Sequence, residues 1–538
     1  MRTFKLSLLI TLLLSVFSQQ NVCGQPGRDA GNGRPGRLGG GRPDMMGGMS
    51  GRGGSANGAA TTYPYETNIN DKWRYDSETD TYYIVGIVYC SNPADRQHEQ
   101  MGIYVPAAYM DAVKSSDSTF TCTVNTQRMV SGLSATSAPI VLPVNTPGYS
   151  AMSAPSGSNR RVKEFTDEGL IYLSAGCRGK ESGAPAGVTD LKAAVRYFRY
   201  LAQVQKAVPG NADEIYSFGH SGGGAQSAIL GSSGDSPLYD AYLKAIGAEM
   251  AFSDALGGSM CWCPITNFDQ ADAAYEWNMG ASRSNLSDEE SNISLALTKE
   301  FAEYINSVGF VHPSTGKTLK LDSTADGRYQ SGSYYDYVID IINDAVKRYN
   351  NVNGSDVVLY KTGDEDALAD FSKNHKRASK GIGAFDDYDA QGRTSAENLL
   401  FSTDGQFAHF SKVVKDAVDM YTPDYSAKFI ADMAKKDAVG TDLATRMNMY
   451  TPLYFLISSK QSYPGGGKGS SKVAPRWRIR TGITQGDTSL ATEINLALAL
   501  QAYGIKDVDF ETIWNQGHTE AEDSGKANTN FINWVKRN

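Results

Sequence analysis

The sequence predicts an α/β fold in which helices cover both faces of a mostly parallel sheet and a large, mainly helical segment interrupts that sheet. Three observations predict it. Short apolar runs bounded by turn residues recur at wide spacing, amphipathic helical patterns lie between several of them, and the alternation stops over residues 273–451. Strands that alternate with helices are typical of βαβ units on a parallel sheet.

The composition is that of a globular chain whose length exceeds that of one ordinary domain. The chain has 538 residues, 41% of them hydrophobic and 20% charged, which excludes wholesale disorder. The net charge is −8, and basic residues outnumber acidic ones in the first sixty positions, so the remainder is more acidic than the total suggests. An acidic body argues against nucleic acid or an anionic membrane as the main partner.

The N-terminal residues have the features of an export signal. Arg2 and Lys5 precede an apolar run over residues 6–17, which is too short to span a membrane. Val22 is bulky where a lipoprotein processing site takes a small residue, so a signal peptide over residues 1–23 is favoured over lipid attachment at Cys23. Residues 24–61 are rich in Gly and Arg and predict a disordered spacer. We therefore expect a secreted or periplasmic protein without a membrane span.

The body divides into a sheet domain in two parts, residues 62–272 and 452–538, around a lid at 273–451. We expect strands at 82–90, 101–105, 139–144, 170–175, 215–218, 260–265, 477–483 and 508–514. We expect helices at 189–202, begun by Thr189 or Asp190, and at 489–502, ended by Gly504. The lid contains helical patterns at 295–308, 335–349, 410–420 and 425–436. The six cysteines are scattered and form no disulfide scaffold or zinc motif, and no metal or organic cofactor is expected.

A Gly-His-Ser-Gly-Gly motif at residues 219–223 follows a predicted strand and precedes a helical pattern. Gly219 and Gly223 suit a sharp strand-to-helix turn, where a β-carbon would collide with neighbouring backbone. Such a turn exposes the Ser221 hydroxyl and directs the Gly222 N–H at a developing oxyanion. Ser221 is therefore the candidate nucleophile, and a Gly-rich turn holding an ordinary serine is the alternative.

An activated serine needs an imidazole, and the chain has only six histidines. His518 follows the last predicted strand, where a loop can carry it over the carboxyl edge of the sheet, at which the serine turn opens. His220 is adjacent to Ser221 and would point away from its hydroxyl. His518 is therefore the candidate general base.

The third member of a triad is an acid that orients the imidazole. Asp487 follows the strand predicted at 477–483, and the order Ser221, Asp487, His518 along the chain is that of an α/β-hydrolase. The alternative is that Asp487 caps the helix that begins near Ser489. A second oxyanion donor is expected from the loop after the strand at 139–144. Pro147 has no N–H, which leaves the N–H groups of Thr146, Gly148 or Tyr149. Of these three, we name Gly148 as the candidate.

These motifs resemble the bacterial tannases, α/β-hydrolases that cleave galloyl esters. The similarity covers about residues 82–518 and is densest at 190–197, in the serine turn and at 243–248. The most family-specific run is 263–267 leading to 274–277, and residues 380–401 resemble the lid signature of the family with a few extra residues before Glu397.

The resemblance implies that Lys380, Glu397 and Asp487 hold the vicinal hydroxyls of a galloyl ring. In the family, two aspartates flank one residue before Thr-Ser, one catalytic and one in contact with substrate; here Gln485 stands in place of the first. Either Asp487 orients His518 and ring recognition is altered, or Asp487 binds substrate and the triad acid is weakened or missing. The first interpretation is favoured.

The expected activity is hydrolysis of a small phenolic ester, with a galloyl or related hydroxycinnamoyl acyl group, by a Ser-His-Asp acyl-enzyme mechanism. One alternative is a general carboxylesterase or peptidase of the same fold, which would accept aliphatic esters or peptides. Another alternative is a hydrolase-like binding protein with impaired catalysis, because the second aspartate of the family is missing from this sequence.

Overall fold

The computed structural model describes residues 69–388, 395–458 and 462–537. The predicted signal peptide, Cys23 and the predicted spacer all lie outside the described residues. Among the helices that the structure describes, none has the length and apolar character needed to cross a membrane.

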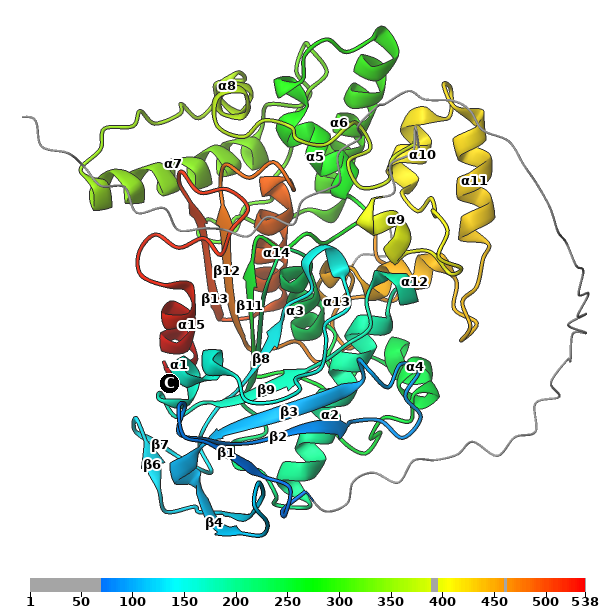
Figure 1. Cartoon of the computed structure of the whole chain (residues 1–538). Coiled ribbons are helices and arrows are strands. Elements are labelled where there is room, and N and C mark those ends of the chain that lie inside the picture. Colours follow the sequence, from blue (N-terminus) through cyan, green and yellow to red (C-terminus); the bar gives the residue numbers. More distant parts are fainter. Residues whose placement is uncertain (1–68, 389–394, 459–461, 538) are drawn as a thin grey trace, which may run out of the picture. The chain divides into compact units, whose positions relative to one another are not determined.

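A nine-stranded sheet forms the centre of the described body, in the order β1-β2-β3-β9-β8-β10-β11-β12-β13 (Figure 1). The six strands from β9 to β13 in this order are parallel to one another, and β1, β2 and β3 form an antiparallel edge. A mostly parallel sheet is thus confirmed. The strands are β1 (Arg74–Asp76), β2 (Thr81–Val88), β3 (Gln100–Pro106), β8 (Ile140–Val144), β9 (Ile171–Ala175), β10 (Ile215–His220), β11 (Gly258–Trp262), β12 (Arg476–Gly482) and β13 (Asp507–Ile513).

Alternate residues of the central strands point to opposite faces, as the period of a strand requires. In β8, Ile140 and Leu142 pack with one set of helices, whereas Val141 packs with the other. The first set comprises α2 (Ala186–Gln203), α3 (Gly222–Ser232), α4 (Asp240–Ala245), α13 (Pro452–Leu456) and α14 (Leu490–Tyr503); the second comprises α1 (Lys163–Thr166) and α15 (Ala527–Lys536). Helices therefore cover both faces of the sheet, as predicted.

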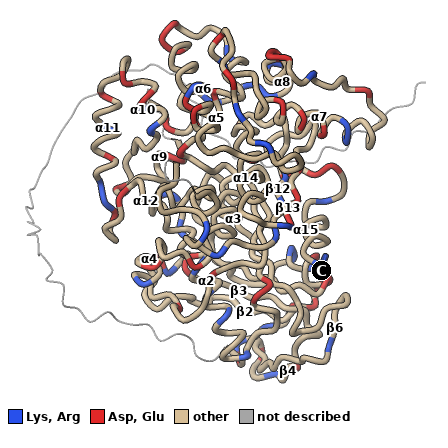
Figure 2. The backbone as a smooth tube through the Cα atoms, turned by 180° about the vertical axis from the view of Figure 1, so that it is seen from behind, with Lys and Arg blue, Asp and Glu red and all other residues tan. Residues whose placement is uncertain are grey.

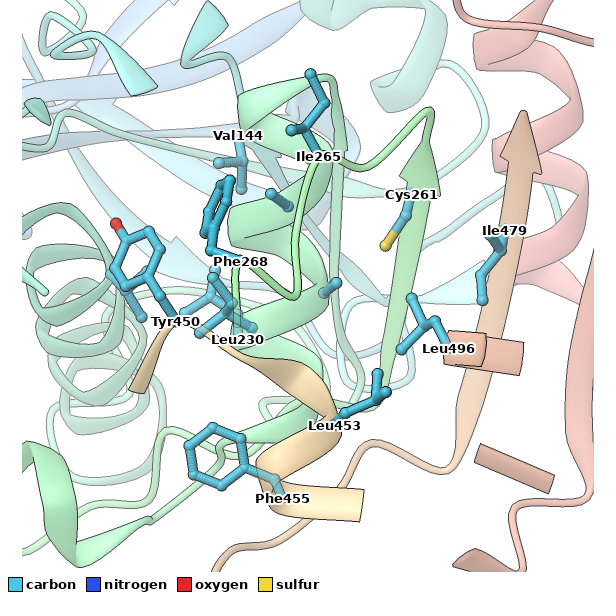
Figure 3. Packing of buried hydrophobic residues seen from close by; sticks show 14 of the residues in the cluster. Val144, Leu230, Cys261, Ile265, Phe268, Tyr450, Leu453, Phe455, Ile479 and Leu496 are labelled. Carbon is cyan, nitrogen blue, oxygen red and sulfur yellow. The ribbon is translucent and has the colours of Figure 1, made fainter. Parts of the chain in front are cut away.

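A mainly helical segment connects β11 to β12. Figure 1 shows it beyond the carboxyl ends of the parallel strands. Its apolar side chains belong to the same continuous hydrophobic cluster as one face of the sheet, and Figure 3 shows Phe268 and Tyr450 packing near Val144. Besides α13, its α-helices are α5 (Ala271–Met279), α6 (Asp288–Val308), α7 (Ser333–Asn353), α8 (Ala367–Asn374), α9 (Ala396–Leu400), α10 (Lys412–Val418), α11 (Pro423–Met433) and α12 (Leu443–Met449).

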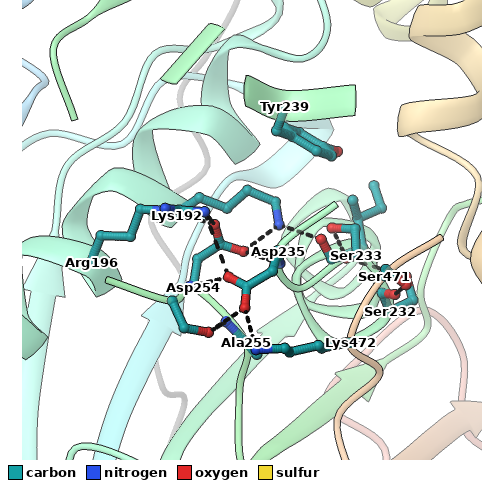
Figure 4. A network of polar contacts seen from close by, with 12 residues as sticks. Lys192, Arg196, Ser232, Ser233, Asp235, Tyr239, Asp254, Ala255, Ser471 and Lys472 are labelled. Atoms are coloured by element: carbon teal, nitrogen blue, oxygen red, sulfur yellow. Dashed lines mark hydrogen bonds and ion pairs between the residues drawn. The ribbon is translucent and has the colours of Figure 1, made fainter. Parts of the chain in front are cut away.

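Buried ion pairs attach α2 to the loop before β11. The Lys192 Nζ atom lies 2.8 Å from Asp254 Oδ1, and Arg196 Nη2 lies 2.6 Å from Asp254 Oδ2 (Figure 4). All three side chains are buried, so the Asp254 carboxylate must keep both partners to avoid an uncompensated charge in the core. Elsewhere basic and acidic positions are interspersed along the backbone (Figure 2).

Several elements differ from the predictions. Helix α2 begins at Ala186, before the predicted Thr189, and its N-cap is Pro185, which has no capping side chain. Strand β11 ends at Trp262, because Cys263 adopts a φ of 44° that leaves the strand. Two small hairpins were not predicted: β4 (Met110–Lys114) with β5 (Phe120–Val124), and β6 (Met129–Val130) with β7 (Leu133–Ser134). The described cysteines are buried free thiols.

Candidate active site

Ser221 lies in a strained turn between β10 and α3. Its φ of 60° and ψ of −124° are unusual for a residue with a side chain and mark the sharp change of direction that exposes its hydroxyl. A β-carbon on Gly219 would lie 2.5 Å from the Gly223 carbonyl oxygen, and one on Gly223 would lie 2.0 Å from the Val144 carbonyl oxygen. Both glycines are therefore required by close backbone contacts, as the sequence predicts.

His518 reaches Ser221 from the loop after β13. Its Nε2 atom lies 2.8 Å from Ser221 Oγ, which is hydrogen-bond distance. The loop passes so close to β12 that a β-carbon on Gly482 would lie 1.9 Å from the Gly517 carbonyl oxygen. Gly482 thus allows the approach that places the imidazole. The structure brings the predicted nucleophile and the predicted base together.

The partner of the other imidazole nitrogen differs from the favoured expectation. Gln485 Oε1 lies 2.6 Å from His518 Nδ1, whereas the nearer carboxylate oxygen of Asp487 lies 3.9 Å from the same atom. The Asp487 side chain is 45% exposed and makes no direct hydrogen bond to His518. Asp487 also does not cap α14, because the side chain of Ser489 accepts the capping hydrogen bond from the Ala491 N–H. The expected direct contact between Asp487 and His518 is therefore corrected to one with Gln485.

The orientation of the Gln485 amide determines which nitrogen of His518 holds the proton. Gln485 Nε2 donates to Thr481 Oγ1 at 2.6 Å and to Glu493 Oε1 at 2.9 Å, so Oε1 faces His518. An amide oxygen only accepts, so Nδ1 is the protonated nitrogen of the neutral imidazole. Nε2 is then free to accept the proton of Ser221, which is the arrangement a general base needs.

Burial and nearby charges set the basicity of His518. Burial lowers the pKa of His518; the Asp487 carboxylate raises it, and the ammonium groups of Lys380 and Lys376 lower it further. The net shift is downward, so the imidazole stays neutral and able to accept a proton at pH values below its ordinary range near 6.5.

This balance predicts opposite shifts for two substitutions. Asp487→Asn removes a negative charge and lowers the pKa of His518 further, whereas Lys380→Met removes a positive charge and raises it. An NMR titration with histidine labelled at Cε1 measures both directly, since the chain has only six histidines. An upward shift in Asp487→Asn would contradict this account of the electrostatics.

The predicted oxyanion donors lie side by side. Gly148 lies in the tight turn Pro147–Tyr149 with a left-handed φ of 53°, and a β-carbon on Gly222 would lie 3.2 Å from Gly148 N. The Tyr149 N–H donates to the Thr146 carbonyl oxygen at 2.9 Å, so it is already engaged. The Gly222 N–H is at the first position of α3, where a helix has no internal acceptor. Gly222 is therefore one candidate donor, and Gly148 and Thr146 are the candidates for the second.

Two of the residues expected to bind a ring, Lys380 and Glu397, lie in the segment between β11 and β12. Lys380 Nζ lies 4.3 Å from the centre of the Phe385 ring, and its charge acts on His518. Glu397 is buried on α9, whose Ala396 would lie 3.9 Å from a β-carbon on Gly148. No described residue donates a hydrogen bond to the Glu397 carboxylate. Lys380 and Asp487 thus lie on the His518 side and Glu397 on the oxyanion side.

A cluster of possible metal ligands includes His518. The ligating atoms of His220, Cys263 and His518 are within 4.8 Å of one another, and the two imidazole rings pack with centroids 4.6 Å apart. Both nitrogens of His518 are engaged with Ser221 and Gln485. Burial raises the pKa of Cys263 to about 11, so the thiol keeps the proton that a metal would have to displace. We therefore assign no metal to this cluster.

Solved structures with the same fold include several enzymes of one kind. No protein-family model matches the chain, and no curated protein matches it significantly. The tannase of Fusobacterium nucleatum is 29% identical, with a TM-score of 0.67, over 85% of this chain and 95% of that one. The tannin acyl hydrolase of Lactobacillus plantarum is 26% identical, with a TM-score of 0.66, over 85% and 93%. A tannin acyl hydrolase in complex with ethyl gallate is likewise 26% identical, with a TM-score of 0.66.

Proposed function

Since the chain belongs to the bacterial tannase family of α/β-hydrolases, we propose that it is a serine esterase that hydrolyses small esters of aromatic acids, galloyl or related hydroxycinnamoyl. The tannase neighbours indicate an ester hydrolase. The observation that carries the proposal further is the 2.8 Å contact between His518 Nε2 and the hydroxyl of Ser221 in its strained turn.

In the proposed reaction, Ser221 Oγ attacks the ester carbonyl while His518 Nε2 takes its proton. The Gly222 and Gly148 N–H groups stabilise the oxyanion that develops. The imidazolium then gives its proton to the leaving alkoxide, and the acyl group remains on Ser221. Water attacks the acyl-enzyme while His518 takes its proton. The imidazolium then returns that proton to Ser221 Oγ as the aromatic acid leaves, so both residues regain their starting states.

Gln485 takes the place that an aspartate holds in a Ser-His-Asp triad. Its amide oxygen fixes the tautomer of His518, whereas a carboxylate would also stabilise the imidazolium by its charge. Asp487, at 3.9 Å, contributes charge from a half-exposed position, where solvent weakens the attraction. Asp487 is thereby left available to accept a hydrogen bond from a phenolic hydroxyl.

Lys380 and Glu397 are the proposed selectivity residues, on a segment that acts as a lid. Glu397 is a buried carboxylate with unused acceptor capacity among the described residues, and a pair of phenolic hydroxyls supplies the donors it lacks. Lys380 donates to a phenolic oxygen. The basic and then apolar residues at 2–17 support export to the periplasm or the medium.

Hydrolysis of methyl gallate, methyl ferulate and a short aliphatic ester by the wild type and by Lys380→Met tests this proposal. We expect the aromatic esters to be preferred, and Lys380→Met to raise KM for methyl gallate by about 10- to 100-fold, the loss of one charge-assisted hydrogen bond. The aliphatic ester should be unaffected when assayed well above the pKa of His518.

Lys468→Met is the matched control, because Lys468 also lies over an aromatic ring, that of Tyr503, but at the far end of α14. Equal effects of the two substitutions would contradict a recognition role for Lys380. A preference for the aliphatic ester would favour the general carboxylesterase, and binding of methyl gallate without turnover would favour the impaired binding protein.

A further inference from the structure

A chain of hydrogen bonds continues from the active site into the core beyond Gln485. His518 Nδ1 contacts Gln485 Oε1 at 2.6 Å, and Gln485 Nε2 donates to Glu493 Oε1 at 2.9 Å. Glu493 is fully buried on α14. The nearest buried carboxylate in this chain of contacts thus lies one residue further from the histidine than in a Ser-His-Asp triad.

The Gln485 amide could occupy its site in two orientations, because its oxygen and nitrogen are nearly equal in size. An ionised carboxylate only accepts hydrogen bonds, so Glu493 selects the orientation in which Nε2 faces it. Thr481 favours the same orientation. Its hydroxyl donates its only proton to Glu493 Oε1 at 3.1 Å, so the hydroxyl oxygen can only accept a hydrogen bond from Gln485, and Gln485 Nε2 supplies it. Turned around, the amide would present a donor to His518 and would place the imidazole proton on the wrong nitrogen.

Lys376 contacts the main chain of Gln485 and stabilises the charge of Glu493. Its buried ammonium donates to the main-chain carbonyl oxygen of Gln485 at 2.6 Å. Its positive charge lowers the pKa of Glu493 and so partly offsets the effect of burial on that carboxylate. Cys263 is the other titratable group in electrostatic contact with Glu493, and it is a protonated thiol at neutral pH. Burial raises the pKa of Glu493 to about 7 and lowers the pKa of Lys376 to about 8, so the carboxylate and the ammonium are both mostly charged between these two values.

We propose that Glu493 is a positioning residue for ester hydrolysis: through Gln485 it holds His518 in the tautomer that accepts the serine proton. The inference rests on the proposed serine esterase function and names the residue that makes an amide workable in place of the triad acid. Glu493 does not touch substrate, so its effect should fall on kcat and leave KM unchanged.

Glu493→Met keeps the size of the side chain and removes the acceptor. Assayed at about pH 7.5, where Glu493 and Lys376 are both mostly charged, it should lower kcat by about 10- to 100-fold, the usual effect of losing the group that orients a functional histidine. Glu493→Gln retains an oxygen that can face Gln485 Nε2 and should fall between Glu493→Met and the wild type. Thr492→Val, on the same helix with its hydroxyl directed at Thr488, is the control and should leave kcat unchanged.

The exchange Gln485→Glu with Glu493→Gln gives the sharpest test, because it moves the carboxylate next to His518 at constant total charge. It should restore kcat at least to the wild-type level. The downfield proton resonance of the His518 Nδ1–H reports the tautomer without turnover; it should be present in the wild type and in the exchanged variant and be lost or weakened in Glu493→Met.

Two outcomes overturn the inference while leaving the esterase intact: a folded Glu493→Met protein with wild-type kcat, or an unchanged Nδ1–H resonance in that protein. Absence of Ser221-dependent hydrolysis of any ester by the wild type would instead overturn the proposed function. The resonance would still show whether Glu493 orients the histidine, so the two failures are distinguishable.

Discussion

Ser221→Ala should lower kcat/KM for methyl gallate by about 10⁴-fold or more, the cost of removing the nucleophile of a serine hydrolase. The reason is geometric. The hydroxyl is held 2.8 Å from His518 Nε2 in a turn whose glycines leave no room for rearrangement. Loss of that oxygen removes both the attacking atom and the point of acyl attachment, and no other described hydroxyl is hydrogen-bonded to His518.

Ser221→Ala should leave folding intact, because alanine can adopt the backbone conformation of residue 221 as readily as serine can. Circular dichroism and thermal unfolding of Ser221→Ala check this. A folded variant that retains more than a small fraction of wild-type turnover would show that the reaction uses another nucleophile.

Gln485→Leu should lower kcat by about 10²- to 10⁴-fold, the larger value being the effect of placing a triad histidine in the wrong tautomer. Leucine has a similar volume but cannot accept the His518 Nδ1–H, and it also leaves Glu493 without one of its two donors. KM for methyl gallate should change little, because Gln485 is buried behind the imidazole.

Asp487→Asn is the matched comparison, since it changes an acidic side chain two residues away in the same loop. We expect it mainly to raise KM for methyl gallate, with a decrease in kcat of about 10-fold or less, because a half-exposed carboxylate at 3.9 Å stabilises the imidazolium only weakly. The reverse result, a large loss of kcat in Asp487→Asn and a small one in Gln485→Leu, would make Asp487 the orienting acid during turnover.

The sequence predicts the fold correctly at elements whose structure is determined by the burial of apolar side chains. The strands β8 to β11 are short, buried apolar runs between turn residues, and helix α14 begins within one residue of the predicted start at Ser489 and ends at the predicted Gly504. Helix α2 begins earlier than predicted because it relies on packing and has no capping side chain. The exposed hairpins of β4 to β7 have no strong apolar alternation, so tertiary pairing decides them.

The sequence locates site residues whose positions depend on the order of the elements along the chain and on the local backbone conformation. The position of Ser221 follows from its strand-to-helix turn and that of His518 from its place after the last strand, and the two side chains meet. The choice between Gln485 and Asp487 depends on how the loop turns at Gly486, which spacing does not specify; the glutamine at an aspartate position of the family was the only signal. The sequence did not indicate a role for Glu493, because an acidic residue in a helix ordinarily faces solvent.

The proposed mechanism requires that Ser221 carries a phenolic acyl group during turnover. Rapid acid quenching of the wild type mixed with excess methyl gallate, followed by peptide mass spectrometry, tests it directly. We predict a galloyl adduct on the peptide that contains Ser221, with a larger trapped fraction in Gln485→Leu if deacylation slows more than acylation. Methyl gallate turnover in which the adduct is absent from this peptide, or lies on another residue, would contradict the account.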